Sequence, residues 1–173
     1  MFLNNQVYPY ELPSIRDIQY QSLEKEYLNA EIISQGILWL ILLIVAFGTS
    51  FIHEEDAPQW VKYILSTIVG LLAIFSFAMT YLGFKYKKYA LRERDIIYSS
   101  GVLWRSNVVI PFNRVQHAEV SQGPLDRLFN LSSLKIYTAG GSSSDLAIPG
   151  LQPSEAERIK YFILNRTASD EEE

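Results

Sequence analysis

The chain has 173 residues, a formal net charge of −4 and no cysteine. The absence of thiols excludes disulfides, thiolate nucleophiles and cysteine-ligated metal sites. The length leaves room for one ordinary domain, or for a small domain with a membrane anchor.

Two long runs without a charged residue occupy the first half of the chain. They cover residues 32–52, IISQGILWLILLIVAFGTSFI, and 63–84, YILSTIVGLLAIFSFAMTYLGF. Each is longer than the roughly 20 residues that a helix needs to cross about 30 Å of hydrocarbon, so both are predicted to be transmembrane helices. The first run begins too far into the chain for a signal peptide and follows acidic residues. We therefore expect it to be retained as an anchor.

The flanks of these two runs differ in charge. The connecting loop, residues 53–62, has one lysine and three acids, whereas five Lys and Arg residues stand between positions 85 and 94. A Lys/Arg bias in short flanks marks the cytoplasmic side of a membrane helix. We therefore expect a multi-pass protein of the cell membrane, with both termini in the cytoplasm and only the loop outside.

The N-terminal segment, residues 1–31, is predicted to be partly helical. Apolar residues recur at helical spacing between residues 14 and 31. This helix either continues into the first membrane helix or lies along the membrane interface, and the sequence leaves both arrangements open.

The second membrane run has a stripe of small residues on one face. Such stripes let helices approach closely inside a bilayer, so we interpret this one as a packing face. A transport pathway is disfavoured because neither run contains Asp, Glu, Lys, Arg or His. The stripe consists of Ser66, Gly70, Ala73, Ser76, Thr80 and Gly83.

Residues 85–166 form short alternating runs broken by turn signals, which is typical of a small antiparallel sheet. Six short strands are too few to close a large barrel, so a helix is expected to cover an open end of a bent sheet. An acidic tail, residues 167–173, follows. The predicted strands are 84–92, 96–99, 102–110, 115–120, 134–140 and 146–149, and the predicted helix is 153–166.

The segment RVQHAEVSQGPLDRLFNL contains residue types that are common in active sites, but apart from the outward polar residues each type has a role in folding. Ala118 and Val120 are predicted to face the core, and the parity of the apolar residues predicts a bulge just after Arg114. Pro124 is expected to start a short helix. Asn130 is expected to end it in a left-handed conformation.

The pieces SSGVL, IPFNRVQH and SQGPLDRLFNL together resemble the bacterial PH domain family, over about residues 85–163. Two membrane helices ahead of one such domain resemble the YdbS-like membrane proteins of that family. The resemblance implies an α+β membrane protein: a two-helix transmembrane hairpin, then a PH-like antiparallel β-barrel or split sheet capped by a C-terminal helix. It also implies a place at the cytoplasmic membrane surface, often beside a larger relative with several copies of the domain. No catalytic motif defines the family.

Candidate chemical residues do not combine into a convincing site. His117 and His53 are expected on opposite sides of the membrane, so no histidine-based metal site can form, and Glu119 with Asp126 would make a weak oxygen site at best. A Ser-His-Asp set from residues 142–145 and His117 lacks a strained nucleophile turn. We therefore expect no enzyme activity, no metal and no cofactor.

Three functions remain, of which an interaction module is the main hypothesis. Such a module would bind another membrane protein, a multi-copy PH-domain relative or its own copies, with no nucleic-acid partner. Its expected contact surface is a strand edge at Trp104, Arg105 and Asn107, which could accept an added strand, with the outward row His117, Glu119 and Gln122.

The alternative hypothesis is a surface that senses anionic lipids. Juxtamembrane Lys and Arg are each attracted to an anionic leaflet by about 1 kcal/mol, although the same cluster can serve only as a topology signal. An enzyme with an unrecognised site is the weakest hypothesis. The expected lipid-binding residues are Lys85, Lys87, Lys88, Arg92 and Arg94.

Overall fold

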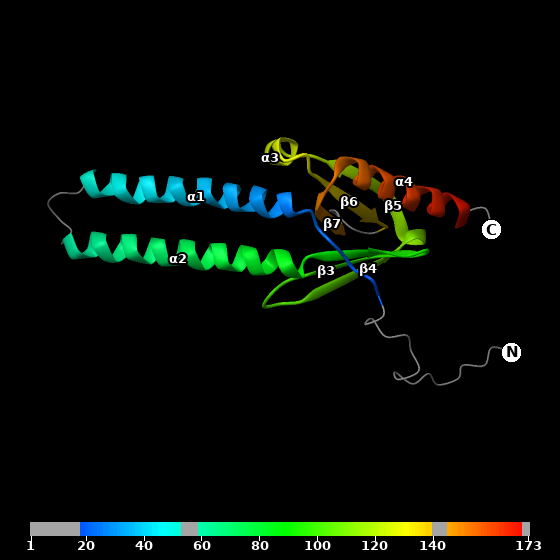
Figure 1. Ribbon diagram of the computed structural model, residues 1–173, viewed down its shortest axis with the longest axis horizontal. Helices are drawn as coiled ribbons and strands as arrows, with labels where there is room; N and C mark the ends of the chain where they lie inside the picture. The colour runs from blue at the N-terminus through cyan, green and yellow to red at the C-terminus, as the bar shows by residue number, and fades with distance from the viewer. Residues whose placement is uncertain (1–17, 53–58, 140–144, 171–173) are drawn as a thin grey trace, which may run out of the picture.

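The computed structural model describes residues 18–52, 59–139 and 145–170. Two long helices, α1 (Lys25–Ile52) and α2 (Gln59–Tyr86), lie side by side and lead into a domain made of β-strands and shorter helices (Figure 1). Both contain a stretch long and apolar enough to cross a membrane, Lys25–Gly48 and Tyr63–Tyr86. Most large apolar side chains of these stretches are exposed in the isolated chain, which is what lipid-facing helices require.

The first sheet follows the helix pair and is antiparallel. Its order is β1-β2-β3-β4. Alternation in β3 and β4 places Ile96 and Ile110 opposite each other in the core, while the outer edge of β4 has no strand partner among the described residues. The strands are β1 (Gln21–Ser22), β2 (Lys88–Leu91), β3 (Asp95–Ser100) and β4 (Ser106–Pro111).

The second sheet has the order β5-β6-β7 and begins after a short 3-10 turn, η3 (Phe112–Arg114). The pairing of β5 with β6 shifts between Val115 and His117, which confirms the predicted bulge. Asn130 has a φ of 52°, so the left-handed stop is confirmed as well. The elements are β5 (Val115–Ser121), α3 (Pro124–Leu128), β6 (Ser132–Thr138) and β7 (Leu146–Leu151).

The last helix, α4 (Pro153–Asp170), covers the second sheet and η3. Ala156 and Ile163 on its apolar stripe are fully buried, and the ring of Phe162 meets Phe112 edge to face at 5.9 Å. The sheets stay separate, so the domain is a split sheet capped by a helix and not a closed barrel. The predicted fold class is therefore correct in its split-sheet form.

Three element boundaries differ from the predictions. A helix over residues 14–31 is wrong at Gln21–Ser22, which pairs with β2 as a strand; the helix proper starts at Lys25 and continues into the apolar run. The expected first strand starts later, because α2 continues to Tyr86. The expected strand from residue 102 starts at Ser106, because residues 101–105 form a turn. In the second case continuous helix satisfies more backbone hydrogen bonds near the membrane than an early strand would.

Candidate functional site at the junction of helices and domain

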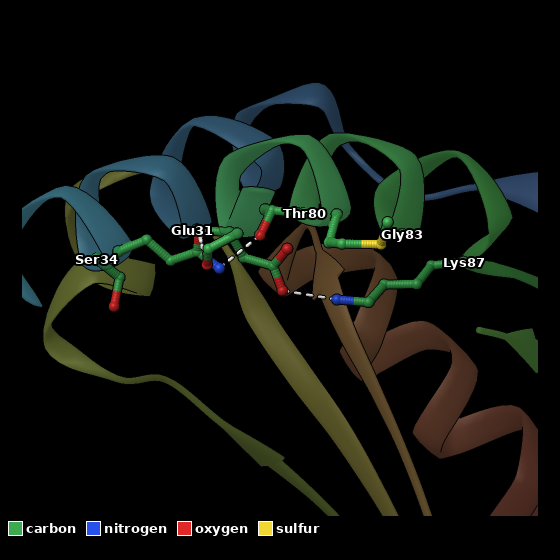
Figure 2. A pocket seen from close by; sticks show the side chains of 8 residues that line it. Glu31, Ser34, Thr80, Gly83 and Lys87 are labelled. Atoms are coloured by element: carbon green, nitrogen blue, oxygen red, sulfur yellow. Dashed lines mark hydrogen bonds and ion pairs between the residues drawn. The ribbon is translucent and has the colours of Figure 1, made fainter. Parts of the chain in front are cut away.

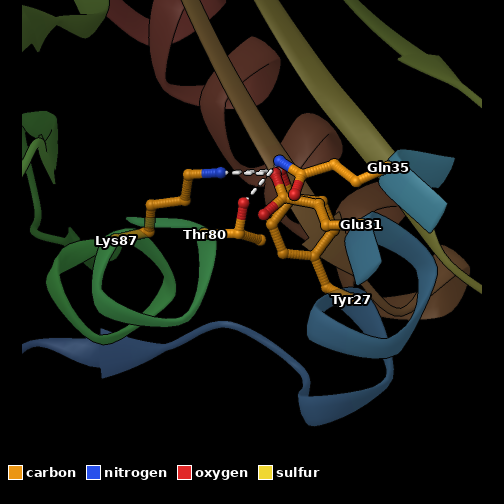
Figure 3. A network of polar contacts seen from close by, with 5 residues as sticks. All are labelled: Tyr27, Glu31, Gln35, Thr80 and Lys87. Carbon is orange, nitrogen blue, oxygen red and sulfur yellow. Dashed lines mark hydrogen bonds and ion pairs between the residues drawn. The ribbon is translucent and has the colours of Figure 1, made fainter. Parts of the chain in front are cut away.

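A polar cluster joins α1 and α2 where the helices meet the domain (Figure 3). Lys87 Nζ donates to Glu31 Oε1 at 2.6 Å and to the Tyr27 hydroxyl at 2.9 Å. The Tyr27 hydroxyl in turn donates to Glu31. The side chains of Lys87 and Glu31 are only 23% and 27% exposed, so the pair is partly desolvated and its hydrogen bonds are stronger than those of a surface pair.

A second layer of this cluster lies deeper in the helix pair. The Gln35 amide donates to the Thr80 hydroxyl, and the Ser76 hydroxyl donates to the Gln35 carbonyl oxygen at 3.4 Å. Ser76 lies ten residues before the end of α2, about 15 Å along a helix axis. Amide and hydroxyl bonds at that depth hold two helices together where lipid offers no alternative partner.

The cluster lines an open groove between the helices, with a volume of about 460 Å³ (Figure 2). Ser34 is exposed at its rim, whereas Gln35, Ser76 and Thr80 are half-buried. The groove offers hydroxyl, amide and ion-pair groups, which can form hydrogen bonds with a molecule that enters it. The lining residues are Glu31, Ser34, Gln35, Ser76, Met79, Thr80, Gly83 and Lys87.

The residues of the small-residue stripe on α2 lie in different surroundings. Ser76 and Thr80 contact Gln35 of α1, while Gly83 faces Val102 of the β3–β4 turn, with 3.9 Å between an ideal Cβ and Val102 Cγ2. The Ser66 hydroxyl donates to the carbonyl of Tyr63 in its own helix. Gly70 has open space where a side chain would stand, and Ala73 is half-buried.

The five juxtamembrane cations do not form one cluster. Lys85 and Lys88 lie at the membrane end of the domain, over the rings of Tyr81 and Tyr20, at 4.6 and 4.0 Å from the ring centroids. Lys87 is held by Glu31. Strand β2 then carries the chain about 13 Å away at about 3.3 Å per residue.

Arg92 and Arg94 therefore lie at the far end of the sheet, in the turn between β2 and β3 (Figure 1). Arg92 is also paired with Asp95, with 2.6 Å between Nε and Oδ1. Of the five cations, only Lys85 and Lys88 lie near the membrane and have no carboxylate partner among the described residues.

The expected strand-edge surface is only partly on a strand. Asn107 is exposed on β4, whereas Trp104 and Arg105 belong to the preceding turn. That turn lies beside the last turn of α2, because the Arg105 guanidinium stands 5.4 Å from the Tyr86 ring centroid. Trp104 is 85% exposed.

The outward row of β5 is engaged in local contacts. His117 packs against Tyr137 with ring centroids 5.7 Å apart, and the Tyr137 hydroxyl donates to Glu119 at 3.2 Å. Burial and this bond to a carboxylate raise the pKa of Tyr137. Gln122 donates to the Leu131 carbonyl at 2.6 Å. His117 and Glu119 thus take part in cross-strand contacts, and Gln122 ties the end of β5 to the residue before β6.

Asp145 closes a hairpin and does not reach His117. Its carboxylate accepts from the Thr138 amide and hydroxyl, both at 2.7 Å, and these bonds hold the pKa of Asp145 below its usual value. Residues 142–144 and His53 lie outside the described residues. Within the described ranges no three His, Asp or Glu side chains gather closely enough to hold a metal ion.

The Glu31–Lys87 pair was missed by sequence reasoning, although a signal existed. Glu31 stands directly before the first charge-free run, and Lys87 stands three residues after the second. Two antiparallel helices of similar length bring such positions to the same level. From the sequence alone Lys87 is a topology signal or a lipid-binding cation, because nothing local links it to Glu31, which stands 56 positions earlier.

Comparison with known proteins identifies the family. The model of the bacterial PH domain matches residues 30–167, so the match includes the helix pair and reaches beyond residues 85–163. The UPF0699 transmembrane protein YdbS of Bacillus subtilis (strain 168) is 33% identical over 144 residues, which cover 82% of this chain and 87% of that protein. The UPF0699 transmembrane protein YdbT of the same strain is 24% identical over 123 residues, or 70% of this chain, and the chain spans only 25% of it.

Among solved structures, a DUF1696 family protein with a pleckstrin-homology domain from Shewanella loihica PV-4 is similar to this chain. It is 18% identical with a TM-score of 0.37, and the match covers 47% of this chain and 70% of that one. The family match over most of the chain and the YdbS similarity carry the assignment. This chain is a membrane protein that belongs to the bacterial PH domain family.

Proposed function

We propose that this protein is an interaction module anchored in the cell membrane, with its PH-like domain and both termini in the cytoplasm. Its partner is another membrane protein, either a relative with several PH-like domains or a second copy of the chain. The protein itself catalyses no reaction. The Lys and Arg residues after α2 support the orientation.

The polar groove between α1 and α2 carries this proposal. Ser34 is exposed at its rim, and Gln35, Ser76 and Thr80 line it at the depth of the hydrocarbon. Polar side chains inside a bilayer are costly when they face lipid and are commonly satisfied by neighbouring helices. A third helix, supplied by the partner, would cover these groups and use the open space beside Gly70.

Two further observations support a partner of this kind. The Bacillus subtilis relatives include one of similar length and one of which this chain spans a quarter, so short and long members occur in one strain. The outer edge of β4, which pairs with no strand in the described part of the chain, provides a second contact surface in the cytoplasm, where a strand could be added through backbone hydrogen bonds.

The test uses the absence of native cysteine, which makes every introduced thiol unique. Ser34→Cys carries a thiol-directed benzophenone in the groove, and Ile32→Cys carries it about 160° around the same helix. In native membranes we expect Ser34→Cys to give one adduct of fixed mass and Ile32→Cys to give none. Equal labelling from both positions, or no adduct from either, would contradict a partner in the groove.

A further inference from the structure

The turn between β3 and β4, residues 101–105, lies at the level where α2 leaves the apolar phase. Val102 faces Gly83, and Arg105 lies over Tyr86, the last residue of α2. Figure 1 shows this turn reaching back along α2 toward the helix pair. Because the charge-free run ends at Phe84, the turn stands at the depth of lipid headgroups.

The tip of this turn carries two large exposed apolar side chains. Leu103 is 70% exposed and Trp104 is 85% exposed. Gly101 fixes the tip, since its φ is +99° and an added Cβ would lie 1.8 Å from the Trp104 carbonyl oxygen. A rigid turn that presents Trp and Leu at a membrane surface is suited to insertion, because Trp favours the interface between headgroups and acyl chains.

Behind the tip lies a cavity of about 510 Å³ with a cationic lining. Lys88 and Arg105 supply the charge, and Ser99, Ser100 and Asn107 supply hydroxyl and amide donors. No acidic residue lines it. Lys88 and Arg105 touch aromatic rings but form no ion pair with any acid in the described part of the chain.

We propose that this cavity binds the phosphate of an anionic phospholipid, with Lys88 and Arg105 as the cationic ligands and Leu103 and Trp104 inserted beside its acyl chains. Arg and Lys around hydroxyl donors suit a phosphate group. The apolar tip favours a lipid over free phosphate. The site lies at the opposite end of the sheet from the Arg92–Asp95 turn, and it shares no lining residue with the groove of the proposed function.

The experiment places the full-length protein in phosphatidylcholine nanodiscs and follows the fluorescence of Trp104. Trp39→Phe and Trp60→Phe leave Trp104 as the single tryptophan. Brominated phosphatidylglycerol and brominated phosphatidylcholine are compared as quenchers at the same low mole fraction. We expect phosphatidylglycerol to quench at least about twofold more strongly, because an anionic lipid accumulates at the site.

Matched variants separate the site from general charge. Lys88→Gln with Arg105→Gln should abolish the difference between the two lipids, whereas Arg92→Gln with Arg94→Gln, at the far end of the sheet, should preserve it. Equal quenching by both lipids in the parent protein, or no quenching by either, would overturn the proposal. Inorganic phosphate that removes the preference at matched ionic strength would assign the site to free phosphate and overturn the lipid.

Discussion

Gly150 of β7 lies directly against the ring of Tyr27 in α1. An ideal Cβ on Gly150 would stand 2.5 Å from Tyr27 Cγ, and the Glu24 amide donates to the Gly150 carbonyl at 3.0 Å. Leu23, one residue earlier, is part of the domain core. The start of the first membrane helix is therefore built into the PH-like domain.

Gly150→Ala should loosen this junction. The residue has a φ of +66°, and the added methyl group would collide with the base of the Tyr27 side chain, which cannot swing away. We expect a loss of about 2 kcal/mol in the free energy of unfolding. Gly70→Ala is the control, because Gly70 has open space around it. Unfolding in detergent by urea compares the two, and equal stability would show that the junction is not tight.

The stability that the Glu31–Lys87 ion pair contributes should depend on the two charges being opposite, and not on which of the two positions carries the acid. Glu31→Lys alone places two cations together and should cost about 2 kcal/mol or more. The double variant Glu31→Lys with Lys87→Glu restores opposite charges beside the Tyr27 hydroxyl and should recover at least about half of that loss. Unfolding of the two variants and the parent protein measures this. A double variant no more stable than Glu31→Lys would refute the pairing.

Gln35→Leu should weaken the contact between α1 and α2. It removes the hydrogen bonds to Thr80 and Ser76 inside the bilayer, which are worth about 0.6–2 kcal/mol together with their partners. A double-mutant cycle with Thr80→Val isolates the term that the two side chains share. Additive losses would mean that Gln35 and Thr80 do not stabilise each other.

Tyr89→Phe should change how stability depends on pH. The Tyr89 hydroxyl donates to Glu155 at 2.7 Å, and burial together with this bond raises the pKa of Tyr89 above its usual value of about 10. A raised phenol pKa stabilises the fold fully below about pH 10, and that contribution is lost as the pH rises toward the folded pKa. The variant should lose about 1 kcal/mol at neutral pH and show a shallower decline above pH 10. Equal slopes in pH-dependent unfolding would refute this assignment.

His117→Ala with Glu119→Ala should leave the proposed function intact. The pair loses only its cross-strand contacts with Tyr137, so the cost should stay at about 0.5 kcal/mol. The benzophenone adduct formed by Ser34→Cys in native membranes should be unchanged. Loss of cellular function together with an unchanged adduct would instead indicate a chemical role for His117 and Glu119.

Local signals in the sequence were sufficient for much of the fold. The bulge near Val115 and the left-handed Asn130 follow from side-chain parity and turn chemistry, which act over a few residues. The cavity at Lys88 and Arg105 could not be predicted, because strand register and a turn fixed by Gly101 bring its walls together. The strand at Gln21–Ser22 was missed for a similar reason, since two residues carry no periodic signal and pair only through tertiary contact.

The mass of the intact complex, extracted from native membranes directly into polymer nanodiscs, tests the partner most directly. The single chain weighs 19.8 kDa. We expect a complex of fixed composition and higher mass, which Ser34→Trp reduces to the single chain by filling the groove, whereas Ile32→Trp leaves it assembled. A wild-type protein recovered only as the single chain, or a complex that survives Ser34→Trp as well as Ile32→Trp, would contradict an interaction module that binds through the groove.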